Sequence, residues 1–457
     1  MASDIAEHNV PARAATLAER RRAFALLFVS LLCLGAGQSV MFAILPSLAR
    51  QLGLSEFQAS LPFVVSAAIW VFTSGYWGEK SDRWGRKPII LLGLTAFGIS
   101  FGLFALIASL GIARLWPVAL VYPLMIAARA LYGVFGSGAS PSAQAYVADR
   151  TTRHERIAGV ATISAAFGLG TTIGPGIGAV LVVFGLFAPF YFTAFAALAS
   201  AAVIWLFLPE HSAPRLMLEN RPSLKWHDAR IWPFILYGTG IATAGAVPIQ
   251  TVGYFVIDVL HKSAGAAPQF TGIGLVATSA AALFAQLVIV QRFNFSARNL
   301  MRVGGVITVI SFLLFLVSHH FAPLIFALLL NGLGLGLVRP GYYAAASLAV
   351  DSHEQGAVAG LTGATAGAGF IFGPMIATEL YRFSPFAPYI FGAGLMAACH
   401  FYALISPHLR QAGLISAEPS LVEDATDTQV PNTSDVSWKV ASAASSTKGP
   451  RPSQAET

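Results

Sequence analysis

Between two long apolar runs, the chain carries a short and strongly charged segment, Gly78-Glu79-Lys80-Ser81-Asp82-Arg83-Trp84-Gly85-Arg86-Lys87. Its two glycines permit a tight reversal of the backbone, and Asp82 can accept hydrogen bonds from the free amides at the start of a helix. A loop that only fixes the orientation of membrane spans needs positive charge alone. The additional G-x-x-x-D-R-x-G-R-K spacing therefore indicates that this turn has a specific role between two helices.

The apolar character of the flanking runs extends over the whole chain of 457 residues. Hydrophobic residues make up 56% of the sequence and charged residues 11%, whereas an ordinary soluble domain contains about 25% charged residues. This composition excludes a disordered chain, a coiled coil, a nucleic-acid-binding module and a soluble enzyme, which would expose more charge. The net charge of +7 is spread over short clusters without a basic stripe, so lipid is the expected surrounding.

Apolar runs of about 17 to 25 residues recur along the chain, and a helix needs about 20 residues to cross the hydrocarbon of a bilayer. Because lipid offers no partners to backbone amides and carbonyls, such segments must be helical. The sequence thus predicts an all-α membrane protein. Its 12 transmembrane helices are expected near residues 23–45, 58–78, 88–110, 117–142, 157–184, 187–208, 231–257, 271–291, 303–318, 322–348, 356–378 and 386–406.

The positive charges divide unevenly between the two sides that this arrangement creates. One side receives 22 Lys and Arg residues and the other receives 4, while Arg129 and Arg339 fall inside spans. Since cytoplasmic loops carry the excess of Lys and Arg, both termini are expected in the cytoplasm of a protein that crosses the cell (inner) membrane several times. The first apolar run is longer than the apolar core of a signal peptide and is expected to be retained.

The two halves of the chain share a pattern that indicates an internal repeat. The pattern Pro141, Asp149, Gly159 and Gly174-Pro175 is echoed 199 to 202 residues later by Pro340, Asp351, Gly360 and Gly373-Pro374. The segment after residue 406 is rich in Ser, Thr and Pro, which is typical of disorder. The predicted parts are a cytoplasmic segment 1–22, a six-helix bundle 23–208, a cytoplasmic loop 209–230, a six-helix bundle 231–406 and a disordered cytoplasmic tail 407–457.

The segment at residues 78–87 resembles the signature of the major facilitator superfamily, which lies between the second and third spans of that family. The resemblance extends over roughly residues 23–406 and implies two pseudo-symmetric six-helix bundles that rock about a central cavity. It also implies that the turn is a cytoplasmic latch, in which Asp82 and Arg83 pair with neighbouring helix ends. The stretch 291–302 of the second half has three Arg but no Asp, so the latch is expected to be degenerate there. The latch candidates are Gly78, Asp82, Arg83, Gly85, Arg86, Lys87 and Asp149.

A run of small residues lies in the fifth expected span, Gly168-Leu169-Gly170-Thr171-Thr172-Ile173-Gly174-Pro175-Gly176-Ile177-Gly178. Small residues let helices approach closely, and Pro175 removes one backbone hydrogen bond, so ordinary helix packing would suffice to explain the run. The run also resembles the G-P-x-x-G motif of proton-coupled exporters of the superfamily, with Ala179 in place of the last Gly of the fuller form. This resemblance implies export and a kinked hinge at Gly170, Gly174, Pro175 and Gly178.

Arg129 falls near the middle of the fourth expected span, where a guanidinium is costly unless it is paired or hydrated. It matches the span-four Arg of the exporters, and the resemblance implies a role in proton coupling or substrate contact. Arg339, in the tenth span, lies closer to the cytoplasmic end, where an extended side chain could reach water. His400 is a candidate proton shuttle, with a place at the membrane interface as the alternative.

Acidic residues are scarce inside the expected spans, where Asp258 and Glu379 come nearest to bilayer depth. A cavity with arginine and no central acid favours anionic, zwitterionic or neutral substrates. Polar and aromatic residues at plausible cavity positions are further candidates, although an aromatic residue at helical spacing is more often a packing residue. The candidate cavity residues are Gln38, Phe42, Tyr146, Gln250, Tyr254, Gln286, Asn331, Arg339, Tyr342 and Tyr343.

The sequence contains neither the G-x-x-x-x-G-K-S/T loop of nucleotide hydrolases nor the H-E-x-x-H of metalloproteases. Cys33 and Cys399 lie in apolar runs near opposite ends of the chain, which makes a disulfide framework or a metal site improbable. We therefore expect a monomeric transporter with no cofactor and no metal, rather than an enzyme. The expected partners are a small-molecule substrate, protons and membrane lipid, with no nucleic acid.

The function that these features favour is secondary transport, most similar to the 12-span drug:proton antiporter branch of the superfamily. Protons would drive the efflux of a small organic molecule from the cytoplasm by alternating access. The substrate class stays open between a broad set of hydrophobic drugs and an anionic metabolite such as a carboxylate siderophore. An importer with the same fold is disfavoured by the span-five motif, and a non-transporting membrane receptor is the alternative from another class.

Overall fold

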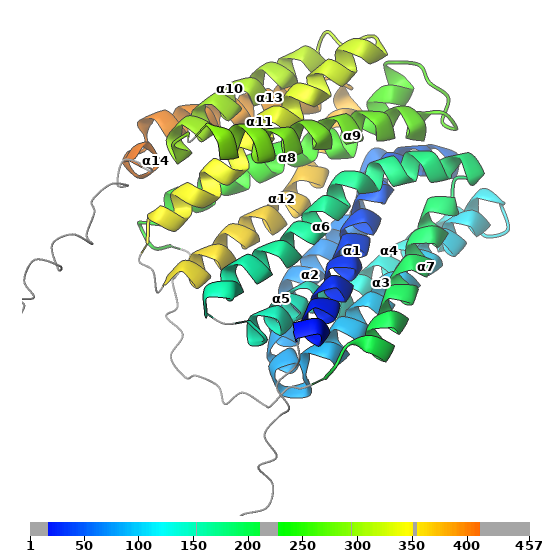
Figure 1. Ribbon diagram of the computed structural model, residues 1–457. Coiled ribbons are helices and arrows are strands. Elements are labelled where there is room, and N and C mark those ends of the chain that lie inside the picture. Colours follow the sequence, from blue (N-terminus) through cyan, green and yellow to red (C-terminus); the bar gives the residue numbers. More distant parts are fainter. Residues whose placement is uncertain (1–16, 152, 211–226, 294, 351–353, 412–457) are drawn as a thin grey trace, which may run out of the picture. The chain divides into compact units, whose positions relative to one another are not determined.

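The computed structural model describes residues 17–151, 153–210, 227–293, 295–350 and 354–411 (Figure 1). Within these ranges, 12 helical stretches are long and apolar enough to cross a membrane, and no strand occurs. The expected all-α membrane fold with 12 transmembrane helices is therefore confirmed. The segment before residue 17, most of the central loop and the tail after residue 411 lie outside the described residues.

The first six spans form one bundle around a core of aromatic rings. Phe101, Phe104 and Phe190 are fully buried in this core, and the Phe104 and Phe190 ring centroids lie 5.7 Å apart. The helices are α1 (Leu17–Leu52), α2 (Glu56–Trp84), α3 (Arg86–Ile112), α4 (Val118–Gly136) with its continuation α5 (Ala139–Asp149), α6 (Arg153–Leu181) with a short 3-10 turn (Val182–Phe184), and α7 (Ala188–Phe207).

The last six spans form a second bundle with a core of its own. Phe255, Phe315 and Tyr389 are fully buried there, and the Phe315 and Tyr389 rings stack with centroids 4.1 Å apart. The helices are α8 (Trp232–Asp258), α9 (Ala267–Phe284) with a π-helical end η2 (Ala285–Val290), α10 (Ala297–Phe315), α11 (Phe321–Leu348), α12 (Gln355–Phe383) and α13 (Ala387–Ile405).

A short helix, α14 (Pro407–Gln411), corrects the expectation that the chain is a disordered tail from residue 407. Leu409 is fully buried, and α14 packs against α8, α10 and α13. The Ser- and Thr-rich composition of the whole segment concealed this single apolar residue, because an average over many residues does not resolve one helical turn.

The helices extend beyond the apolar runs because charged and polar residues continue them on both sides. The first helix, α1, has 36 residues, whereas about 20 suffice to cross hydrocarbon. The start of α2 is fixed by a capping box, in which the Ser55 hydroxyl accepts a hydrogen bond from the Gln58 amide (3.2 Å) and the Gln58 side chain accepts one from the Ser55 amide (2.9 Å). Such caps satisfy backbone groups that lipid would leave unpaired.

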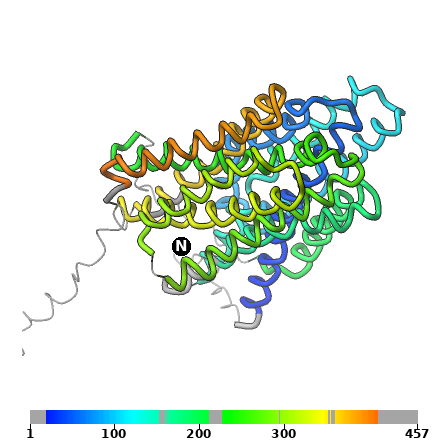
Figure 2. The backbone as a smooth tube through the Cα atoms, turned by 90° about the horizontal axis from the view of Figure 1, so that it is seen from above, coloured from blue at the N-terminus to red at the C-terminus, as the bar shows by residue number. Residues whose placement is uncertain are grey.

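The second bundle repeats the packing of the first. Helix α6 packs along α1, and α12 packs along α8 in the same way. The helices of both bundles run in a similar direction, as Figures 1 and 2 show. The bundles meet where α2 faces α12 and where α6 faces α9, while α1 also touches α8 and α9. These four contacts define the interface along which the two bundles can move.

Candidate functional site

The reversal between α2 and α3 depends on one glycine, Gly85. Its φ of 97° lies in the left-handed region that favours glycine, and a Cβ at this position would lie 2.7 Å from Glu210 Oε1. The expectation that Gly78 also serves the reversal is wrong, since α2 continues through Gly78 to Trp84. No neighbouring atom of the described residues lies within 4 Å of where a Gly78 Cβ would be.

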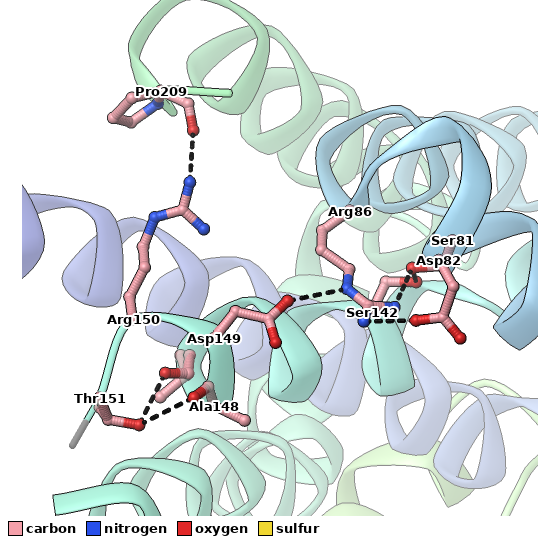
Figure 3. Close-up of polar contacts among 10 residues, drawn as sticks. Ser81, Asp82, Arg86, Ser142, Ala148, Asp149, Arg150, Thr151 and Pro209 are labelled. Carbon is pink, nitrogen blue, oxygen red and sulfur yellow. Dashed lines mark hydrogen bonds and ion pairs between the residues drawn. The ribbon is translucent and has the colours of Figure 1, made fainter. Parts of the chain in front are cut away.

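Arg86 is the centre of the charged segment (Figure 3). Its Nη2 lies 2.5 Å from Asp82 Oδ1, and its Nε lies 3.2 Å from Asp149 Oδ2. Its Nη1 donates a hydrogen bond to the Ser81 hydroxyl (3.0 Å), which in turn accepts one from Ser142 (2.8 Å). Arg86 therefore ties the end of α2, the start of α3 and the end of α5 together. We refer to the helix ends that carry Asp82, Arg86 and Asp149 as the latch face.

The structure assigns the pairing role in this latch to Arg86 rather than Arg83. Arg83 is exposed and forms no hydrogen bond or ion pair with any other described residue, while Lys87 is half-buried beside it. The reversal at Gly85 explains the difference: it brings Arg86, at the start of α3, back to Asp82 at the end of α2, whereas Arg83 directly follows Asp82 on α2 itself. The expected partner Asp149 is brought to the site as the resemblance implied.

Tyr146 lies beside the latch and braces it from α5, so it does not line a central cavity. Its hydroxyl donates a hydrogen bond to the Pro209 carbonyl (2.8 Å), just after α7. The guanidinium carbon of Arg150 lies 3.6 Å from the Tyr146 ring centroid, and Arg150 also donates to Pro209 O (3.4 Å; Figure 3). Polar contacts thus connect the latch face of the first bundle from α2 to the end of α7.

The second bundle has a different ion cluster at its latch-face end. Arg230, just before α8, meets Glu354 at the start of α12 through two nitrogens, each 3.0 Å from a carboxylate oxygen. Asp228 lies 3.0 Å from Arg230 and completes the cluster. Hydrogen bonds from Arg230 lower the pKa of the Asp228 carboxyl, and the two carboxylates raise the pKa of Arg230. This ion cluster thus links the start of α8 to the start of α12.

Arg129 of α4 is enclosed by the first bundle, with 2% of the residue exposed. Its Nη2 donates a hydrogen bond to Gln38 Oε1 of α1 (3.1 Å). The guanidinium carbon lies 5.2 Å from the ring centroid of Phe63, 5.0 Å from Phe101 and 5.4 Å from Tyr132. Four helices, α1 to α4, therefore supply its surroundings.

The charge of Arg129 is only partly compensated. Its Nε and Nη1 have no hydrogen-bond partner, and no carboxylate of the described residues forms an ion pair with it. Each cation–π contact contributes about 0.5 to 2 kcal/mol, whereas a lone charge at membrane depth is expensive. In this conformation the group faces aromatic rings and not an open cavity, so a change in hydration or hydrogen bonding would alter its energy strongly.

Arg339 of α11 has the opposite character, because it is exposed. A Cβ at Gly245 of α8 would lie 3.1 Å from its Nη2, which places the guanidinium between α11 and α8. It forms no ion pair with a described residue.

Gln250 of α8 is 5% exposed, and Gln286 is half-buried in the π-helical end η2, a type of turn that often marks functional sites.

Several candidate cavity residues make contacts within or between helices instead. Asn331 is 1% exposed and donates a hydrogen bond to Ser311 of α10 (3.0 Å). The Tyr342 hydroxyl lies 3.1 Å from the Thr365 hydroxyl of α12, and Tyr343 beside it is 44% exposed. Phe42 of α1 packs against the core of the second bundle. Of these four residues, Tyr343 is the most exposed.

The small residues of α6 form a stripe that faces α1. A Cβ at Gly174 would overlap the Ala36 carbonyl and the Ser39 hydroxyl, and one at Gly170 would overlap the Leu32 carbonyl. Gly178 extends the stripe one turn further, since a Cβ at this position would lie 3.2 Å from Val40 O. The other side of α6 faces the second bundle, where a Cβ at Gly272 of α9 would lie 2.9 Å from Pro175 O and overlap Ala179. Gly272 thus provides the space that the missing last glycine of the motif would have left.

A second charged cluster lies at the opposite helix ends, which carry Arg50, Glu56 and Asp258 and are referred to as the far face. Arg50 Nη2 lies 2.7 Å from Glu56 Oε1 and 2.7 Å from Asp258 Oδ2. Tyr381 of α12 donates a hydrogen bond to Asp258 (3.2 Å), and Tyr254 covers Arg50 with its ring. Sequence reasoning missed this cluster. Arg50 was one of only 4 Lys and Arg residues expected on this side of the membrane, and this scarcity could have indicated that it pairs with the nearby acids.

The contact between α2 and α12 weakens from the far face toward the latch face. At the far face, the Ser60 and Thr378 hydroxyls are 3.4 Å apart. Midway, a Cβ at Gly367 would lie 3.6 Å from Val71. Closer to the latch face, the Cβ positions of Gly78 on α2 and Gly360 on α12 have no described atom within 4 Å. The bundles are therefore joined at the far face and separate toward the latch.

The structure also places a serine motif of α3 and the candidate proton shuttle His400. The letters G-x-S-x-G occur at Gly98–Gly102, but this stretch lies inside α3 and Ser100 is fully buried, so it is no exposed nucleophile. His400 of α13 lies against Gly305 of α10, where a Cβ would come within 3.0 Å of its Nδ1.

Two membrane-spanning bundles that touch at one face and separate toward the other define an integral, multi-pass transporter rather than an enzyme. The sequence family agrees with this class. The family model of the Major Facilitator Superfamily matches residues 27–263 and 249–443, so the chain belongs to this superfamily.

The chain is also similar to individual relatives in sequence and to solved structures in fold. The chain is 27% identical to Multidrug resistance protein 2 of Bacillus subtilis over 393 residues, which cover 83% of this chain and 93% of the relative. It is 30% identical to the Bacillibactin exporter of Bacillus subtilis over 156 residues, 34% of this chain and 37% of that protein. The fold resembles the crystal structure of a bacterial homologue of the human lysosomal transporter Spinster in an inward-facing and occupied conformation, with a TM-score of 0.66 at 14% identity, covering 88% of this chain and 97% of that one.

Proposed function

We propose that the protein is a proton-coupled exporter of the cell (inner) membrane, which moves a small organic molecule out of the cytoplasm by alternating access. The observation that carries the proposal is the uneven contact between the bundles, which are joined at the far face and separate toward the latch face. Because the excess of Lys and Arg marks the cytoplasmic side, the latch face is cytoplasmic and the conformation is inward-facing. Substrate then enters between the bundles from the cytoplasm, where both termini also lie.

Two features favour export over import. The Gly174-Pro175 run of α6 resembles the motif of proton-coupled exporters, and it packs against α1 and α9 at the interface between the bundles. A relative that matches over most of the chain is a multidrug resistance protein. Proton coupling follows from the same resemblance.

In this proposal the latch, Arg129 and the glycine stripe of α6 have separate roles. Arg86, with Asp82 and Asp149, holds the ends of α2, α3 and α5 together as the bundles move. Arg129 couples the cycle to protons, because its partly compensated charge responds to any change in its surroundings. Gly174 and Pro175 let α6 shift along α1.

The assignment of Arg129 is tested by transport in proteoliposomes with an imposed pH gradient and a fluorescent, uncharged hydrophobic drug as the probe. Arg129→Ala is expected to abolish pH-driven transport while the protein still inserts and purifies as the parent does. Arg292→Ala is the matched control, because Arg292 is an exposed arginine at the end of η2 and its loss should leave transport intact. Normal transport by Arg129→Ala would refute the coupling role.

A second substrate class, an anionic metabolite such as a carboxylate siderophore, is favoured by Arg339. This arginine is exposed between α8 and α11 and forms no ion pair with a described carboxylate, whereas Arg129 is enclosed by aromatic rings. The partial similarity to a siderophore exporter points in the same direction. Cells that lack the protein should then release less siderophore into the medium, whereas increased sensitivity to cationic drugs alone would support the drug exporter.

A further inference from the structure

The far-face cluster joins the two bundles through a single nitrogen. Arg50 Nη2 is 2.7 Å from Glu56 Oε1 of the first bundle and 2.7 Å from Asp258 Oδ2 of the second. The two carboxylate oxygens therefore lie within twice that distance of each other and compete for one guanidinium. The three side chains together carry one net negative charge.

The remaining polar groups around the cluster do not neutralise this charge. The hydroxyl of Tyr381 donates to Asp258 at 3.2 Å, and the buried hydroxyl of Tyr254 has no hydrogen-bond partner among the described residues. The other titratable groups nearby face elsewhere or pair with each other: Arg382 with Glu379 at 2.7 Å on α12, Lys262 over the Phe270 ring at 5.0 Å, Tyr389 with Thr251 at 3.1 Å, and the exposed His261.

We propose that Arg50, Glu56 and Asp258 form a gate, the Arg50 gate, which holds the far face closed and which opens when Arg50 leaves Asp258 and stays with Glu56. The proposal deepens the exporter function and rests on it for the direction of transport. Release of substrate at the far face requires α1 to move away from α8, so the contact between Arg50 and Asp258 must break in every cycle. Arg50 can stay with Glu56, because both belong to the first bundle.

The two carboxylates of the gate have opposite effects. Removal of the charge on Asp258 takes away the partner that Arg50 has in the second bundle, which favours opening of the far face. Removal of the charge on Glu56 has the opposite effect, because Glu56 competes with Asp258 for Arg50. A merely structural ion cluster would not give effects of opposite sign.

The gate is tested by disulfide cross-linking across the far face. Ser60→Cys and Thr378→Cys place thiols where two hydroxyls are now 3.4 Å apart, in a full-length background with Cys33→Ser and Cys399→Ser. In liposomes at neutral pH, Asp258→Asn should slow cross-linking by about 2- to 5-fold, as expected for a half-exposed ion pair. Glu56→Gln should speed it, and Asp258→Glu should retain the parent rate. Glu379→Gln is the matched control, because it breaks an ion pair on the same face within one helix.

Equal cross-linking rates in the parent and in Asp258→Asn would overturn the gate. Cross-linking needs neither substrate nor gradient, so a failure of pH-driven transport would count against the exporter function alone.

Discussion

At the scale of the residue, the latch depends on the absence of one side chain at Gly85. Its left-handed backbone would be strained by any side chain, and a Cβ would press on the Glu210 carboxylate, whereas Gly78 lies in a regular helix with no described atom within 4 Å of its Cβ position. Gly85→Ala is expected to lower the free energy of unfolding by about 1 kcal/mol or more. Gly78→Ala should leave it unchanged or raise it by about 0.5 to 1 kcal/mol. Thermal unfolding in detergent measures both, and equal losses would contradict the assignment of the turn.

A second residue-scale prediction concerns pH and the cluster of Arg230. The pKa of Asp228 is lowered from its ordinary value of 3.8 by hydrogen bonds from Arg230. A carboxyl with a depressed pKa stabilises the fold above its ordinary pKa, and this contribution is lost as the pH falls through the folded-state value. Asp228→Asn should therefore melt below the parent at pH 7, and the two melting curves should converge in strong acid. A difference that persists undiminished there would argue against the ion pair as its cause.

The candidate site could be predicted from sequence where the partners lie close in sequence or share a signature. Asp82, Arg86 and Asp149 were all named and do meet, although the resemblance favoured Arg83 over Arg86. The sequence could not predict the pairing of Arg50 with Asp258, which are 208 residues apart and belong to different bundles. Likewise, sequence alone cannot show that Tyr146 and Asn331 point at neighbouring helices, because that depends on the rotation of each helix.

At the scale of the element, α6 is a helix whose two sides serve different partners. Its glycine stripe touches the backbone of α1, so Gly174→Val should force the two helices apart and lower the free energy of unfolding by about 1 to 3 kcal/mol. Gly168→Val is the matched control on the same helix, since its Cβ position has no neighbouring described atom within 4 Å. Comparison of their thermal unfolding tests the stripe; similar losses would show that helix propensity alone explains them.

At the scale of the whole molecule, closure of the far face depends on the fit between α9 and α6. Gly272→Val would place methyl groups where Pro175 O and Ala179 now lie, so the bundles should be held apart at this face. The Ser60→Cys and Thr378→Cys pair should then cross-link more slowly. Gly363→Val of α12, with no described atom near its Cβ position, is the control that should cross-link at the parent rate. Unchanged cross-linking in Gly272→Val would show that this contact does not limit closure.

The whole fold was more accessible to sequence reasoning than the site. Apolar length and the lack of backbone partners in lipid predict 12 membrane helices without any tertiary information, and 12 are present in the described residues. The helix ends were set too short, because helices such as α1 continue into water with charged residues. How the bundles tilt against each other depends on a few contacts, such as Gly272 against Ala179, whose partners lie in different halves.

The length of α1 links these observations mechanically. Its 36 residues extend over about 54 Å, well beyond the hydrocarbon thickness of about 30 Å. This single helix carries Gln38, which binds Arg129, near its middle and Arg50 at its far-face end, with Pro46 between them. A rotation of about 10° around the middle would displace each tip by about 5 Å. A small tilt of α1 that begins beside the buried Arg129 would thus move the far-face end of the helix far enough to separate Arg50 from Asp258.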